Sequence, residues 1–180
     1  MAQNYGRDPI LEAYHLWNSN GWEDAAAGCT AVTSLMRVHQ MMTRRADQIL
    51  APLDLTFARY ELLVRLYFRD GSLPLSQLGK ELQIHQTSIT SLVDKLEKQG
   101  LIERTPHPTD RRSTIAQMTP AGRTLTGKAI NLLNAEFFRD LGLTDPEARL
   151  LIGLLMKIRR SWNDIENEAG WEPFGGDSAG

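Results

Sequence analysis

The chain has 180 residues, of which 42% are hydrophobic and 23% are charged, and its formal net charge is −2. This length suffices for one core, or for a small core together with a dimer interface. No apolar run approaches the roughly 18 residues of a membrane-spanning helix. The start of the chain has neither a basic stretch nor an apolar run, so no secretory signal is expected. The expected location is therefore the cytoplasm. The single cysteine excludes an internal disulfide framework and a multi-cysteine zinc site.

The first part of the chain is expected to be helical. Up to about Gly21, apolar residues at helical spacing indicate either a short docked helix or an arm exchanged with a partner. From about Asp24 to Leu50, apolar residues recur every three to four positions, which predicts a helix of about 40 Å. Such a helix is too long to be covered by one small core. Pro52 ends it, and Thr56 is expected to cap a second helix that closes at Asp70–Gly71.

The next segment has the order of a helix-turn-helix. Ser76 is expected to cap a short helix, and Ile84–His85 to form a tight turn. A longer helix then runs from about Gln86 to Gln99, and Gly100 ends it because glycine readily adopts the positive φ of that position. This helix has a polar face opposite an apolar one, which consists of Ile89, Leu92, Val93 and Leu96.

Two predicted strands, 101–105 and 113–118, flank a polar loop and complete a winged helix-turn-helix. Thr119–Pro120 opens the next helix, with proline at a permissive first position. The residues 144–147 form a capping-box sequence that starts the last helix. That helix carries a seam at a spacing of about 3.5 residues, which requires a partner. The seam consists of Leu151, Leu154, Ile158, Trp162 and Ile165.

These elements predict a fold that is mainly α with a small β-wing, organised as an intertwined homodimer. The expected regions are an N-terminal arm or short helix over 1–23, a helical dimerisation region over 24–50 and 120–168, a winged helix-turn-helix lobe over 51–119, and a flexible tail over 169–180.

Three stretches of the sequence resemble the multiple antibiotic resistance regulator (MarR) family. They are 89–104, 108–113, which contains Asp-Arg-Arg, and 118–122, which contains Thr-x-x-Gly. The resemblance covers about Asp24 to Ile165. It implies a triangular dimer whose first and last two helices intertwine. It also implies a repressor that a small phenolic or anionic compound releases from its operator.

DNA reading needs short polar side chains near the start of a helix that enters the major groove. The candidates for base contacts are Gln86, Thr87, Ser88 and Ser91, and Thr90 is assigned to a phosphate or a packing contact. The candidate phosphate contacts, which position the protein without reading sequence, are Lys80, Lys95, Lys98 and Arg104. The alternative is an ordinary solvated helix face. Eight cations against five anions between Lys80 and Lys128 give this region a modest basic excess.

The wing needs a long cation that can enter a narrow minor groove. The resemblance implies that Arg111 is this groove residue. It also implies that Arg112 pairs with Asp110 or Asp94 and braces the hairpin. His85 stands at the cap position of the recognition helix, where histidine is a poor cap, so a phosphate contact is the alternative for this side chain.

The resemblance places an effector pocket between the dimer helices and the DNA-binding lobe. The residues expected there are His39, Phe57, Tyr60 and Arg65, although a core position is the alternative for His39. Cys29 is a candidate peroxide sensor, but the sensing cysteine of such relatives is expected about one turn later, near Val32. A cysteine on an apolar helical face usually belongs to the core.

Enzymatic function is not expected, because the sequence has no glycine-rich phosphate loop, nucleophile elbow or His-Glu-x-x-His run. No cofactor or metal is expected either, since the four histidines lie in separate segments. The predicted function is a regulator that binds double-stranded DNA at a pseudopalindromic operator as a homodimer and responds to a small molecule. The alternatives are a protein-interaction module on the same fold and a redox sensor that uses Cys29.

Overall fold

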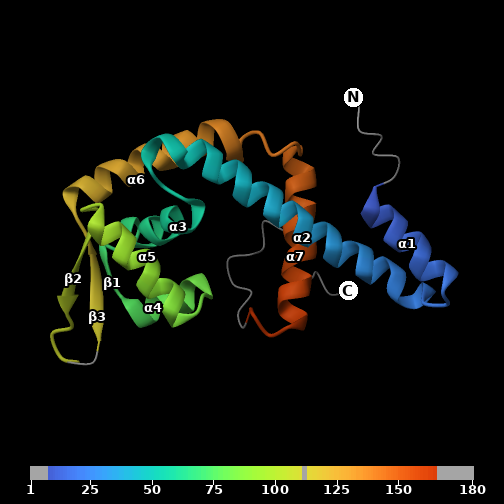
Figure 1. Ribbon diagram of the computed structural model, residues 1–180, viewed down its shortest axis with the longest axis horizontal. Coiled ribbons are helices and arrows are strands. Elements are labelled where there is room, and N and C mark those ends of the chain that lie inside the picture. Colours follow the sequence, from blue (N-terminus) through green and yellow to red (C-terminus); the bar gives the residue numbers. More distant parts are fainter. Residues whose placement is uncertain (1–7, 111–112, 166–180) are drawn as a thin grey trace. The chain divides into compact units, whose positions relative to one another are not determined.

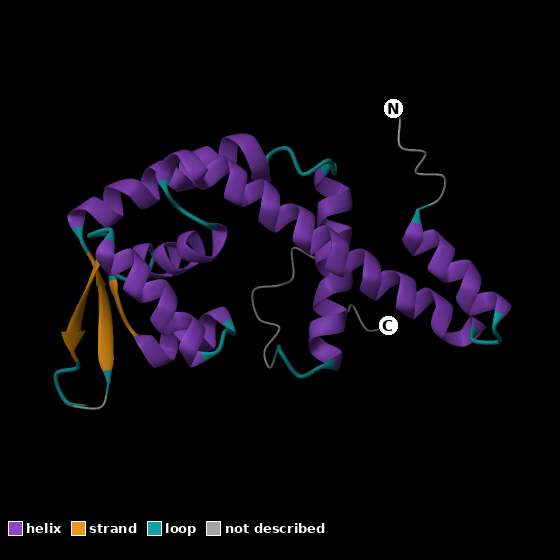
Figure 2. Cartoon of the chain, viewed as in Figure 1, coloured by secondary structure: helices purple, strands orange, loops and turns teal. Residues whose placement is uncertain are grey.

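The computed structural model describes residues 8–110 and 113–165, apart from the side chain of Gln86, and these residues form a mainly helical fold with a small antiparallel sheet (Figures 1 and 2). The helices are α1 (Pro9–Ser19), α2 (Glu23–Leu50), α3 (Phe57–Tyr67), α4 (Leu75–Leu82), α5 (Gln86–Lys98), α6 (Pro120–Leu133) and α7 (Asp145–Ser161). The strands are β1 (Ser72–Pro74), β2 (Ile102–Pro106) and β3 (Thr114–Met118). Short turns of helix follow α2 at Ala51–Leu53 and α6 at Asn134–Phe138.

The chain divides after Phe137 into two compact units. The first unit contains the core, to which the C-terminal end of α2, the helices α3 to α6 and all three strands contribute. Its fully buried large side chains are Leu50, Leu62, Leu63, Leu66, Leu78, Ile89, Val93, Leu96, Ile102 and Leu133. The predicted fold class, mainly α with a β-wing on a helix-turn-helix, is confirmed.

The sheet has the order β1-β3-β2, and both pairings are antiparallel. The hairpin of β2 and β3 pairs Glu103 with Gln117 and Thr105 with Ile115, as the sequence predicts for a wing. Strand β1 is not predicted by the sequence. Its central residue Leu73 pairs with Ala116 of β3 and is buried, so it closes one side of the core.

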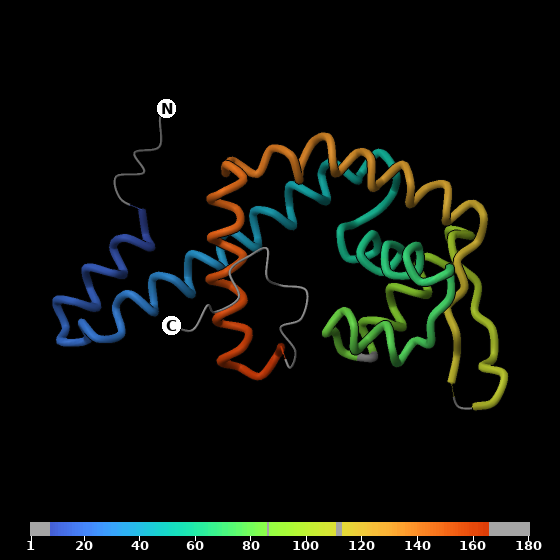
Figure 3. The backbone as a smooth tube through the Cα atoms, turned by 180° about the vertical axis from the view of Figure 1, so that it is seen from behind, coloured from blue at the N-terminus to red at the C-terminus, as the bar shows by residue number. Residues whose placement is uncertain are grey.

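The long helix predicted from about Asp24 to Leu50 is present as α2, and α1 packs against it (Figure 3). Asp8 caps α1 by accepting a hydrogen bond from the Ile10 amide at 3.0 Å. The N-terminal half of α2 keeps large apolar side chains in contact with solvent, among them Val32 and Met36, which are 50% and 63% exposed. None of the helices in the described ranges is both long and apolar enough to cross a membrane.

Two predicted helix boundaries are wrong. Helix α4 begins at Leu75 with Pro74 at the cap position, so Ser76 lies in its first turn and does not cap it. The reason is that β1 keeps the chain extended up to Pro74, which then leads directly into the helix. Helix α7 ends at Ser161 and does not reach Ile165, because Asn163 adopts a left-handed backbone with φ of +57°.

The start of α7 is predicted correctly. The capping box of Thr144 and Glu147 is present: the Thr144 amide donates to the Glu147 carboxylate at 2.8 Å, and the Thr144 hydroxyl donates to it at 2.7 Å. Within this second unit, Leu154 and Trp162 of the predicted seam are 55% and 76% exposed.

Candidate nucleic-acid interface

Helix α5 separates its apolar and polar side chains cleanly. Ile89, Val93 and Leu96 are fully buried in the core of the first unit. The other face is exposed along the whole helix, and its described members are Thr87, Ser88, Thr90, Ser91, Lys95 and Lys98. Of the predicted base contacts, Thr87 and Ser91 lie one helical turn apart on this face. Short hydroxyl side chains therefore stand at the N-terminal half of an open helix surface, as reading a major groove requires.

His85 caps α5, which the sequence analysis did not expect of a histidine. Its Nδ1 lies 3.3 Å from the Thr87 amide nitrogen, from which it accepts a hydrogen bond, and 3.1 Å from the Thr87 hydroxyl oxygen. A ring nitrogen accepts only when it carries no proton. The proton of the neutral ring therefore lies on Nε2, and the exposed side chain retains one donor beside the start of the helix.

The C-terminal end of α5 is tied to the start of α6. Gly100 has φ of +69°, and the Leu101 amide donates to the Leu96 carbonyl at 3.0 Å, which closes the helix. The Thr119 hydroxyl donates to the Gly100 carbonyl at 2.8 Å, and the Thr119 amide donates to the Leu101 carbonyl at 3.0 Å. Gly122 is buried against that same carbonyl. The Thr-x-x-Gly sequence thus anchors the turn that follows α5.

Arg104 of β2 is part of the internal bracing of this surface. It forms ion pairs with Asp94 and, at 2.9 Å, with Glu97, both on α5. Its guanidinium also lies 3.4 Å from the Thr90 carbonyl oxygen, and its side chain is 28% exposed. Asp94 therefore braces the wing strand through Arg104, whereas Arg112 lies outside the described residues. A phosphate contact by Arg104 stays a prediction.

The wing loop folds around His107, whose role the sequence analysis missed. Its Nδ1 accepts hydrogen bonds from the Asp110 amide at 3.2 Å and from the Thr109 amide at 3.4 Å. The His107 amide donates to the Ser113 carbonyl at 3.2 Å, and the Ser113 amide donates to the Asp110 carbonyl at 3.0 Å. The two described ends of the connection between β2 and β3 are thus hydrogen-bonded to each other. The groove candidate Arg111 lies in this connection, outside the described residues.

Comparison with known proteins places this architecture in a family. Residues 55–114 match the MarR family. Sco5413, a MarR family transcriptional regulator from Streptomyces coelicolor, is 34% identical, with a TM-score of 0.72 over 78% of this chain and 99% of that chain. The chain belongs to the MarR family. As a MarR-family protein it is a transcriptional regulator.

Further similarities are to one curated relative and to two solved structures. The multiple antibiotic resistance protein MarR from Escherichia coli is 28% identical over 123 residues, which cover 67% of this chain and 85% of that protein. A mutant of E. coli MarR in complex with operator DNA has a TM-score of 0.65 at 26% identity, over 70% of this chain and 91% of that chain. The organohalide-sensing regulator RdhR in its 2,4-dichlorophenol-bound form shares the fold, with a TM-score of 0.68 at 19% identity over 73% of this chain and 78% of that chain.

The four effector candidates differ in their burial. Tyr60 is buried and its ring stacks on Phe57, with the ring centroids 5.8 Å apart. His39 and Arg65 are exposed, so the structure of the single chain does not place His39 in a core. Burial raises the pKa of the Glu61 carboxyl, and Arg65 and His39, both close to it, act in the opposite direction. Arg65 and His39 therefore both lie near the Glu61 carboxyl.

His39 borders a shallow surface depression of about 620 Å³ that only residues of α2 and the turn after it line. Phe57, Tyr60 and Arg65 are not among them. Cys29 is half-buried on α2, which by itself favours neither the redox interpretation nor the core interpretation. No group of three histidine, cysteine or acidic side chains within the described ranges is arranged to hold a metal ion.

Proposed function

We propose that this MarR-family chain is a sequence-specific repressor that binds a pseudopalindromic operator as a homodimer and is released by a small phenolic or anionic effector. It acts through binding and not through catalysis. The observation that carries the proposal is the open polar face of α5, which has a capped start at His85 and an anchored end at Gly100. The relative solved in complex with operator DNA supports DNA as the partner.

A homodimer is supported by the apolar side chains that the single chain leaves in solvent. They occur in both units, and among them are Leu16, Trp22, Val32, Met36 and Met41 in the first unit and Leu150, Leu154 and Trp162 in the second. Two copies of α5 related by a twofold axis would enter successive major grooves about 34 Å apart. The operator is therefore a pseudopalindrome of roughly 16–20 base pairs.

A phenolic effector is supported by the fold relative solved with 2,4-dichlorophenol. The residues we propose for its pocket are His39, Phe57, Tyr60 and Arg65. An effector can release DNA only to the extent that it binds the DNA-free dimer geometry more tightly than the DNA-bound one. The effector then shifts the dimer to a spacing of α5 helices that no longer fits the operator.

Fluorescence anisotropy with the DNA that flanks the protein's own gene tests the proposal. Arg111→Ala should cost about 1–3 kcal/mol of operator binding. Lys128→Ala is the control, because it removes an exposed cation of α6 that belongs to neither α5 nor the wing. A panel of aromatic acids and phenols then identifies compounds that release the wild-type protein.

The alternative, a dimeric protein-interaction module, makes a different prediction in the same assay. Such a module shows no salt-sensitive preference for its own flanking DNA, and Arg111→Ala changes nothing. A redox sensor would instead lose DNA binding on peroxide treatment, and Cys29→Ser would abolish that response. Either result would replace the repressor proposal.

A further inference from the structure

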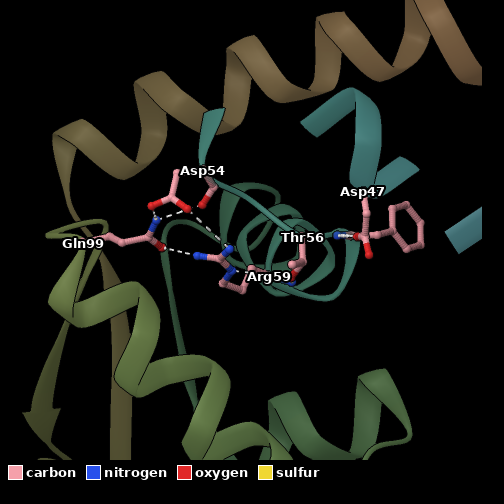
Figure 4. Close-up of polar contacts among 6 residues, drawn as sticks. Asp47, Asp54, Thr56, Arg59 and Gln99 are labelled. Atoms are coloured by element: carbon pink, nitrogen blue, oxygen red, sulfur yellow. Dashed lines mark hydrogen bonds and ion pairs between the residues drawn. The ribbon is translucent and has the colours of Figure 1, made fainter. Parts of the chain in front are cut away.

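A polar cluster of Asp54, Arg59 and Gln99 joins the C-terminal end of α5 to the segment that follows the C-terminal end of α2 (Figure 4). Gln99 is the C-cap residue of α5. Its amide nitrogen donates to the Asp54 carbonyl and to the Asp54 carboxylate, both at 2.8 Å, and its amide oxygen accepts from Arg59 at 2.8 Å. Arg59 also lies 3.8 Å from the Asp54 carboxylate. The contacts join residues 40 and 45 positions apart in the sequence.

The hydrogen-bonding pattern of the cluster depends on the amide side chain of Gln99. Gln99 donates two hydrogen bonds with its amide nitrogen and accepts one with its amide oxygen, and the carboxamide group carries both N–H donors and the acceptor at this length. A glutamate at this position would place its carboxylate against that of Asp54, and an apolar side chain would leave Arg59, which is 13% exposed, without this acceptor.

The cluster is continuous with α2 through short, well-bonded connections. Only the single turn of helix at Ala51–Leu53 separates Asp54 from α2. The Asp47 carboxylate of α2 accepts a hydrogen bond from the amide of Phe57, the first residue of α3, at 2.6 Å (Figure 4). Thr56, directly before Phe57, caps α3 by accepting from the Arg59 amide. Asp54 itself adopts a left-handed backbone with φ of +51°, so its carbonyl and its carboxylate both reach Gln99.

We propose that Gln99, through Asp54 and Arg59, is a positioning residue that sets the tilt of α5 relative to α2. This inference rests on the proposed function. Helix α5 has 13 residues, so its base-reading end lies about 20 Å from Gln99. A tilt of about 5° at the cluster then moves Thr87 by roughly 1.5 Å, which exceeds the tolerance of about 0.5 Å for a preorganised contact. A residue far from any base thereby controls the reading of bases.

The test compares operator binding with binding to non-specific DNA. Gln99→Met removes every hydrogen bond of the amide at nearly constant length, and Gln48→Met, on the exposed face of α2, is the matched control. We expect Gln99→Met to weaken operator binding tenfold or more at a temperature where the variant is fully folded, with non-specific binding unchanged. Gln99→Glu should weaken it as well. The double variant Asp54→Asn with Gln99→Glu exchanges donor and acceptor between the two side chains but leaves the backbone carbonyl of residue 54 facing a carboxylate oxygen, so it should recover only part of the loss.

A second measurement does not use DNA. Spin labels at Arg45→Cys on α2 and Ser91→Cys on α5, in a Cys29→Ser background diluted with unlabelled chain, report the distance between the two helices. Gln99→Met should shift or broaden this distance. If folded Gln99→Met binds the operator like the wild type, or leaves the distance unchanged, the inference is overturned and the cluster only stabilises the fold. Failure of the wild type itself to prefer operator DNA refutes the proposed function, and the spin-label distance still decides whether Gln99 sets the tilt.

Discussion

Replacing Gly122 with alanine should destabilise the protein by about 2–3 kcal/mol. A Cβ at this position would lie 2.0 Å from the Leu101 carbonyl oxygen, whereas real Cβ atoms essentially never come within 3.0 Å of another heavy atom. The Leu101 backbone must therefore move by about 1 Å, although its carbonyl accepts the Thr119 amide at 3.0 Å. Overpacking costs about 1–3 kcal/mol and the lost hydrogen bond about 1 kcal/mol. The better helix propensity of alanine offsets at most about 1 kcal/mol.

Gly127 provides the matched control on the same helix. Its added Cβ would approach only the Tyr67 hydroxyl, at 4.0 Å, so Gly127→Ala should be neutral or stabilising by up to about 1 kcal/mol. Urea unfolding at one fixed protein concentration measures both variants, because dimerisation makes apparent stability depend on concentration. A Gly122→Ala protein as stable as Gly127→Ala would refute the role assigned to the Thr-x-x-Gly turn.

Three further predictions follow from the caps and charges. His85→Asn keeps an acceptor in the place of Nδ1 and should preserve the melting temperature of the protein. His85→Gln does not place an acceptor there and should lower stability by about 1 kcal/mol. Equal melting temperatures of the two variants would contradict the role of His85 as a cap. Hydrogen bonds from Thr144 lower the pKa of Glu147. The capping box therefore contributes its full stabilisation above the ordinary glutamate pKa of about 4.3, and this stabilisation is lost as the pH falls through the lowered pKa. Circular dichroism between pH 6 and 2 should show this acid-side loss in the wild type but not in Glu147→Gln, and parallel profiles would exclude it. A plot of the logarithm of operator affinity against the logarithm of salt concentration should have a slope of about −5 or steeper, because two protomers present three exposed lysines each. A slope near zero would rule out the phosphate contacts. These lysines are Lys80, Lys95 and Lys98.

Elements whose signals are local could be predicted from the sequence. The periodic apolar positions of α2 and α5 and the caps at Thr56, Thr119 and Thr144 lie within one or two turns of the structure they specify. Strand β1 has no such signal, since it has three residues and one of them is proline. It exists because β3 offers an edge that pairs with Leu73, and that edge is set more than 40 residues later in the chain.

The side-chain partners at the interface were harder to predict for the same reason. Arg104, a predicted phosphate contact, also pairs with Asp94 and Glu97, which lie three positions apart on α5 and share a face that β2 crosses. That spacing was a usable signal for an acidic pair in need of a cation. Nothing local indicates that Gln99 meets Asp54 and Arg59, because the contact depends on how α2, α3 and α5 pack.

The internal use of arginine changes how the charge of this chain should be interpreted. Arg104 is held by two carboxylates of α5, and the Arg123 guanidinium lies 5.1 Å from the centre of the Tyr67 ring. The charge of Arg104 is therefore partly neutralised by Asp94 and Glu97, and a count of cations alone overstates the local positive field. What the described part of the lobe offers is a small set of exposed lysines on α4 and α5, close in sequence to the hydroxyl side chains that we propose read bases. A net charge of −2 is compatible with such a protein, because a basic patch attracts DNA through its local field and does not need a basic total.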